Sequence, residues 1–279
     1  MRGSVMASKA AAAYGVDWAR DYDLWLELFV IFNLFCLTGD VALAHASNRF
    51  RNPAEYFPLF YSAVAAIALG VAFAARIFFG MRKVWRYLGF AIAWGSIAVG
   101  VAGVIYHLDS HFFVERTLKS LTYTAPFAAP LAFVGLGCLL LMNRMVPHES
   151  EEWEKWVLFF AFGGFVGNFV LSLADHATNG FFRWSEWLPV ISSSLAIGFL
   201  FLMIVSRVGS GYRQICLAVL VVEVAVGVAG FGLHLSADIH GPAGRLIDNV
   251  LSGAPPFAPL LLPNLAILGW IGLRAHGYR

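Results

Sequence analysis

Eight uninterrupted apolar runs constrain the fold of this chain more than any other feature of its sequence. A helix needs about 20 apolar residues to cross a bilayer, and 59% of the 279 residues are hydrophobic whereas 13% are charged. Because the runs are continuous and do not alternate with polar residues, they favour membrane helices over a β-barrel. We therefore predict an all-α integral membrane protein. Its expected transmembrane helices are 24–46, 57–79, 86–108, 122–142, 156–177, 187–206, 213–235 and 256–274.

An internal repeat divides these helices into two groups. The hexapeptide Ala-Val-Gly-Val-Ala-Gly occurs at 98–103 and again at 225–230, and a histidine follows four residues after each copy's last glycine, at His107 and His234. A repeat of this length indicates two units of one architecture. The further matches are His45 with His176, Glu55 with Glu186, Arg116 with Arg245, and Ala125-Pro126 with Ala254-Pro255.

The repeat predicts two tandem four-helix units of the same orientation, because each unit crosses the bilayer an even number of times. The expected segments are a lead-in at 1–23, a first repeat at 24–142, an acidic linker at 143–155 and a second repeat at 156–274. The termini and the loops on their side hold 13 of the 19 basic residues, which places that side in the cytoplasm. The lead-in lacks the continuous apolar core of a signal peptide, so we expect a retained segment in a bacterial-type inner membrane.

Six of the eight histidines collect at the outer ends of the odd-numbered spans or just beyond them. Residues four apart project from one side of a helix, so His107 shares a face with His111, and His234 with Asp238. Imidazole and carboxylate together suit a transition metal ion such as zinc, iron, manganese or copper. The expected metal ligands are His45, His107, Asp109, His111, His176, His234, Asp238 and His240.

Two other interpretations of these histidines remain open. Facing imidazoles can be the axial ligands of a haem b, although the neighbouring carboxylates favour a non-haem ion. A histidine at a helix end can also lie among lipid headgroups or bind a terminal carbonyl. The sequence contains no sharp metal motif such as HExxH or CxxC, so the metal hypothesis depends on the duplication of the histidines.

Glu223 is a carboxylic acid inside a predicted span, 11 residues before His234, or about 16 Å along a helix. A carboxyl group at that depth is costly and is by default a candidate functional group. We expect it to handle protons or ions as the catalytic residue. The alternative is a protonated, hydrogen-bonded residue of the helix core.

Three classes of function fit these features. The first is an integral membrane metalloprotein with sites on the outer, periplasmic face, which acts as a redox enzyme or as the membrane subunit of a respiratory-type complex. The second is a metal or proton-coupled transporter. The third is a structural subunit of a membrane complex without its own cofactor. The expected partners are the lipid bilayer and other subunits, and a net charge of +2 does not indicate nucleic acid binding.

Overall fold

The computed structural model describes residues 17–18, 20–110, 112–117, 126, 128–178 and 180–276, and all regular structure in these ranges is helical. The helices in the first part of the chain are α2 (Tyr22–Ser47), η1 (Pro53–Glu55), α3 (Tyr56–Phe79), α4 (Arg82–Asp109), α5 (Phe112–Glu115) and α7 (Leu131–Met145). The helices in the second part are α8 (Glu151–Thr178), η2 (Trp184–Glu186), α9 (Trp187–Val205), α10 (Ser210–Ile239), α11 (Leu246–Ser252), η3 (Ala258–Leu260) and α12 (Leu261–His276).

Seven helical segments in the described ranges are long and apolar enough to cross a membrane. They are α2, η1 with α3, α4, α8, η2 with α9, α10, and η3 with α12. Five of them contain a predicted span, and the other two cover 187–205 of the span 187–206 and 258–274 of the span 256–274. The remaining predicted span, 122–142, is described as a helix only from Leu131, and α7 has 15 residues. That length corresponds to about 22 Å, less than the hydrocarbon thickness of about 30 Å. Residues 118–125 and 127 of this region lie outside the described residues.

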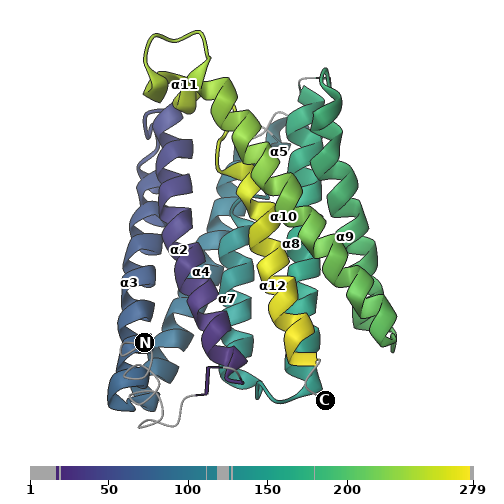
Figure 1. The fold of residues 1–279 in the computed structure, drawn as a ribbon. Coiled ribbons are helices and arrows are strands. Elements are labelled where there is room, and N and C mark those ends of the chain that lie inside the picture. The colour runs from purple at the N-terminus through teal and green to yellow at the C-terminus, as the bar shows by residue number, and fades with distance from the viewer. Residues whose placement is uncertain are drawn as a thin grey trace, which may run out of the picture.

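The long helices form two groups that share one interior (Figure 1). In the first group α3 and α4 pack against α2 and α7, and in the second α9 and α10 pack against α8 and α12. The groups meet where α7 contacts α8 and where α2 contacts α12. One cluster of buried apolar side chains extends across both groups and includes Leu34, Leu139, Phe165 and Leu262.

The surface of the bundle is apolar as well, which is expected when lipid replaces water. Phe35 on α2 and Phe79 on α3 are 70% and 75% exposed. Because both side chains lie on the outside of membrane-spanning helices, they would contact the acyl chains of the lipids. The structure therefore supports a membrane protein in contact with the bilayer.

The bundle has two chemically different ends. We call the end at which α2 begins and α12 ends the terminal end, and the end at which α2, α4, α8 and α10 finish the distal end (Figure 1). The buried interior between them holds few polar contacts. At the junction of the groups, Asn33 on α2 and Asn264 on α12 donate amide hydrogen bonds to each other, as interhelical amides commonly do in membranes.

We predict that α4 and α7 tolerate no side chain at Gly137. A Cβ there would lie 2.5 Å from the Ala93 carbonyl oxygen and 2.8 Å from Ile97 Cγ1. Gly137→Ala should lower the free energy of unfolding by about 1–3 kcal/mol because the α4 backbone must move. Gly135→Ala on the same helix meets nothing within 4 Å and should have no such effect. Unfolding of both variants in detergent micelles tests this, and equal stabilities would contradict the close approach of the two helices.

Candidate metal sites at the two ends of the bundle

At the distal end of the first group, four helix ends bring two histidines and a glutamate together. His45 comes from the last turn of α2 and His107 from the last turn of α4, and their ring centroids are 6.3 Å apart. Glu55, in the 3-10 turn before α3, has its Oε2 atom 3.4 Å from His45 Nδ1. The carbonyl oxygen of Pro126, which precedes α7, lies 2.9 Å from His107 Nδ1.

The second group presents the same kinds of side chain at its distal end. His176 Nδ1 on α8 lies 3.9 Å from Glu186 Oε2 in the turn before α9. His234 Nδ1 on α10 lies 2.8 Å from the carbonyl oxygen of Pro255, which precedes α12. The rings of His176 and His234 are close enough to interact electrostatically, and the Asp175 carboxyl interacts with both.

A common turn after α2 and α8 positions the glutamates. Phe50 and Phe181 have left-handed backbones, with φ of 49° and 50°, a conformation uncommon for a residue with a bulky side chain. Their amides donate to the carbonyls of His45 and His176 at 3.0 and 3.1 Å. Their phenyl rings stack on the first residues of α3 and α9, with centroids 4.5 and 4.0 Å apart. These contacts bring the segment after each turn back toward the histidine at the end of the preceding helix, His45 or His176.

Local hydrogen bonds orient the Glu55 carboxylate. Asn52 caps the turn by accepting from the Ala54 amide at 2.9 Å, and Asn48 Nδ2 donates to Glu55 Oε1 at 3.2 Å. Oε2 of Glu55 is buried, and so is Oε2 of Glu186, and neither atom receives a hydrogen bond from a residue that the structure describes. In both groups, the carboxylate oxygen nearest the histidine is therefore the one that other donors do not engage.

The other residues expected at the distal sites lie apart from these contacts. Asp109 is exposed at the end of α4, and His240 is exposed with its Nδ1 2.8 Å from the Ser236 carbonyl oxygen. Asp238 is 1% exposed and lies beside Asn249, whose Nδ2 donates to its backbone oxygen at 2.9 Å. His111 lies outside the described residues.

The carboxylates found beside the histidines are thus those of the two turns, Glu55 and Glu186. Sequence reasoning noted that these residues match each other but assigned them no role. Their constant spacing from His45 and His176 was the signal that could have identified them.

Glu223 is fully buried between α10 and α9. Ser192 Oγ donates to its Oε2 at 3.2 Å, and Oε1 has no hydrogen-bond partner among the described residues. In the first group the corresponding position is Ser96, whose hydroxyl lies 3.0 Å from that of Tyr61.

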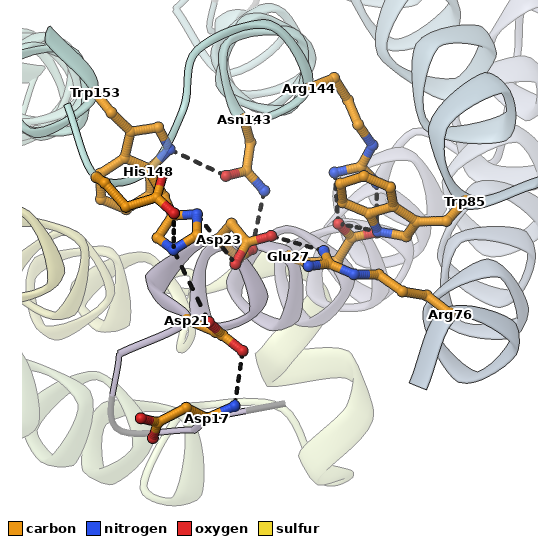
Figure 2. A network of polar contacts seen from close by, with 11 residues as sticks. Asp17, Asp21, Asp23, Glu27, Arg76, Trp85, Asn143, Arg144, His148 and Trp153 are labelled. Carbon is orange, nitrogen blue, oxygen red and sulfur yellow. Dashed lines mark hydrogen bonds and ion pairs between the residues drawn. The ribbon is translucent and has the colours of Figure 1, made fainter. Parts of the chain in front are cut away.

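The terminal end holds a larger polar network, which Figure 2 shows from close by. Glu27 on α2 and Arg144 on α7 form an ion pair at 2.6 Å, and neither side chain is exposed. Trp85 Nε1 on α4 donates to Glu27 at 2.9 Å. The guanidinium groups of Arg76 and Arg144 lie 4.1 and 3.6 Å from the centroid of the Trp85 ring, within the range of cation–π attraction.

Beside this network lie two aspartates and a histidine that could hold a metal ion. His148 Nδ1 is 3.8 Å from Asp23 Oδ1, and its Nε2 is 3.9 Å from Asp21 Oδ1 (Figure 2). Within the described ranges, these three residues are the one group of three or more possible ligands whose ligand atoms all lie within 4.8 Å of one another. His148 is not among the six histidines that the sequence groups at one face, and no local spacing connects it to Asp21 and Asp23, which lie more than 120 positions earlier.

We predict that Arg144→Ala lowers the free energy of unfolding by about 3–5 kcal/mol, because the Glu27 carboxylate would remain buried without its partner. Arg82→Ala, at an exposed position on the same face, should change it by about 0.5 kcal/mol or less. The double change Glu27→Gln with Arg144→Met should cost less than Arg144→Ala alone. Unfolding in detergent micelles measures all three, and equal losses for Arg144→Ala and Arg82→Ala would refute the buried pair.

Comparison with known proteins adds no assignment to these sites. No protein-family model, curated protein or solved structure matches the chain. The chemistry of the two ends of the bundle therefore carries the argument about function.

Proposed function

We propose that this protein is an integral membrane metalloprotein that binds transition metal ions at its distal end, one in each of two tandem four-helix repeats of the same orientation. The observation that supports this most is the duplicated set of two histidines, one glutamate and one proline carbonyl. In each copy the set collects groups from four different helix ends. The basic residues of the sequence place both termini in the cytoplasm, so the sites would face the periplasm.

The contacts of the histidines are typical of metal ligands. A ligating histidine usually has its other ring nitrogen held by a carbonyl or carboxylate, and the proline carbonyls hold His107 and His234 at Nδ1. Their Nε2 atoms are then the ones that would bind the ion. Ligands about 2.0–2.2 Å from one ion lie roughly 3–4 Å apart, which fits the 3.4 and 3.9 Å between His45 and Glu55 and between His176 and Glu186.

Binding would draw the second histidine of each set inward. The distal sets do not have all their ligand atoms within 4.8 Å of one another, so the imidazoles must rotate toward a shared ion. Zinc, iron and copper accept imidazole with carboxylate. The same carboxylates, which lie beside His45 and His176, favour a non-haem ion over haem b.

In this proposal the metal sites serve a redox enzyme or the membrane subunit of a respiratory-type complex, and Glu223 handles protons. Two sites at one end cannot carry electrons across the bilayer by themselves, which is why a partner subunit belongs to the proposal. Metal or proton-coupled transport is the second candidate. The observation that favours it is the buried Glu223 Oε1 atom, which has no hydrogen-bond partner within the described ranges.

We predict that purified protein contains transition metal that depends on both histidine sets. His107→Ala combined with His234→Ala should remove the metal of the distal sites, and either change alone should remove the metal of one site. His240→Ala, on the same helix as His234 but exposed and bound to Ser236, is the matched control. Elemental analysis and an absorption spectrum measure the result, and full metal retention in the double variant would exclude these ligands.

Glu223 separates the two candidate functions. Glu223→Gln should leave the distal metal content unchanged, because no contact joins this residue to a histidine set among the described residues. If the protein transports protons with metal, Zn²⁺ added outside proteoliposomes should change their internal pH, and Glu223→Gln should abolish this change. Glu151→Gln, on an exposed side chain, is the control. A Zn²⁺-dependent change that survives Glu223→Gln would remove this residue from the pathway.

A further inference from the structure

The two aspartates at the terminal end are held in the same way. Asp21 Oδ2 accepts a hydrogen bond from the backbone amide of Asp17 at 2.8 Å. Asp23 Oδ2 forms an ion pair with Arg76 Nη1 at 2.7 Å. The other oxygen of each carboxylate, Oδ1, faces His148 (Figure 2). Metal-ligating carboxylates are usually hydrogen-bonded through their remaining oxygen in this manner.

The distances around His148 do not correspond to hydrogen bonds. Separations of 3.8 and 3.9 Å to Asp23 and Asp21 exceed the usual limit of about 3.2 Å for N–H···O. The two distances involve different nitrogens of the His148 ring, and only one of these nitrogens can bind the ion. With one ligand atom taken from each residue, the three atoms lie within 4.8 Å of one another, so small side-chain movements would bring them to the spacing of ligands that share one ion at about 2.0–2.2 Å. Asp23 Oδ1 is buried, on a side chain that is 8% exposed, and no residue in the described part of the chain donates a hydrogen bond to it. An anionic oxygen in that position is costly unless a cation or donor satisfies it.

We propose that Asp21, Asp23 and His148 form a second kind of metal site, which binds one divalent ion of the zinc or manganese class at the terminal end. One imidazole nitrogen with two carboxylates suits these ions, whereas magnesium and calcium prefer oxygen ligands alone. Glu149 Oε1, 3.4 Å from His148 Nε2, adds negative charge at the exposed edge. Arg76 offsets part of this charge, but its guanidinium is also engaged above the Trp85 ring.

The site is open to exchange. His148 and Asp21 are 22% and 23% exposed, and both line a cavity of about 530 Å³ that also contains Arg82 and Arg86. Such a cavity has room for water molecules that complete the coordination shell and for entry of the ion. Unlike the distal sites, this site lies at the end of the bundle at which α2 begins and α12 ends.

Metal binding here would connect parts of the chain that are distant in sequence. Asp21 and Asp23 lie at the start of α2, and His148 lies in the segment between α7 and α8. The bound ion would therefore attach the link between the two helix groups to the first helix of the first group.

The test uses the full-length protein in detergent, first stripped with a chelator and then titrated with Zn²⁺ or Co²⁺ alone. Besides the metal of the distal sites, wild-type protein should bind one further equivalent. His148→Ala and Asp21→Asn should each weaken the binding of this equivalent at least about tenfold. Glu151→Gln, which removes one exposed charge from the same end, should bind like wild type. The visible absorption of bound Co²⁺ should change in His148→Ala because an imidazole ligand is lost.

The distal sites are separated from this site by His107→Ala with His234→Ala, which should retain the terminal equivalent. Asp21→Asn keeps the shape of the side chain, so it tests the site even if His148→Ala folds poorly. If Asp21→Asn and His148→Ala both bind metal with the stoichiometry and affinity of Glu151→Gln, the terminal site is refuted. Absence of any equivalent in wild type beyond those lost with His107 and His234 also refutes it.

Discussion

A polar group inside hydrocarbon has no water to satisfy it, and this constraint governs the arrangement of the whole bundle. The backbone meets it by forming helices, and the few buried side chains with charge meet it by pairing. Glu27 and Arg144 are fully buried only because each is the partner of the other and Trp85 contacts both. The reciprocal amides of Asn33 and Asn264 meet the same requirement where the two helix groups join.

The same constraint favours the ends of the bundle as positions for histidines and carboxylates. At the distal end the histidines occupy last helical turns, where the chain leaves the apolar interior and carboxylates from the following turns can approach them. At the terminal end the buried network fixes Arg76, and Arg76 in turn holds one oxygen of Asp23. In the proposed terminal site, the packing of α2, α3, α4 and α7 would therefore supply supporting contacts from the interior of the bundle, and the ligands would come from its end.

The sets at the distal end differ from the terminal trio in how their members are related along the chain. Each distal histidine at the end of α2 or α8 is followed closely by the turn that supplies its glutamate, so one stretch of sequence encodes half of a site, and the stretch occurs twice. The terminal trio has no such local origin. Its histidine follows the short helix α7, and only the return of that helix to the start of α2 brings His148 to Asp21 and Asp23.

Local patterns made part of this structure predictable. The seven spans follow from continuous apolar runs, and the placement of His45, His107, His176 and His234 at helix ends follows from where those runs stop. Which carboxylates lie beside the histidines was harder to predict. Helical spacing places Asp238 on the same face as His234, whereas the fold buries Asp238 beside Asn249. The turns at Phe50 and Phe181 bring Glu55 and Glu186 back to the histidines. Each has two consecutive left-handed residues, and only the second turn has a glycine there, Gly180, whereas the first has Arg49.

By itself, the sequence determined that the chain is helical, that its solvent is largely lipid, and that chemically similar segments occur twice. These properties depend on composition and on neighbours within about one helix length, where hydrophobic burial and backbone hydrogen bonding act locally. Only the tertiary structure decided which carboxylates lie beside which histidines, and that Asp21, Asp23 and His148 form one group. The terminal group depends on packing between helices that are far apart in the chain. The contacts of Glu55 with His45 and of Glu186 with His176 depend on the backbone conformation of the turns between them, which hydrophobic periodicity does not encode.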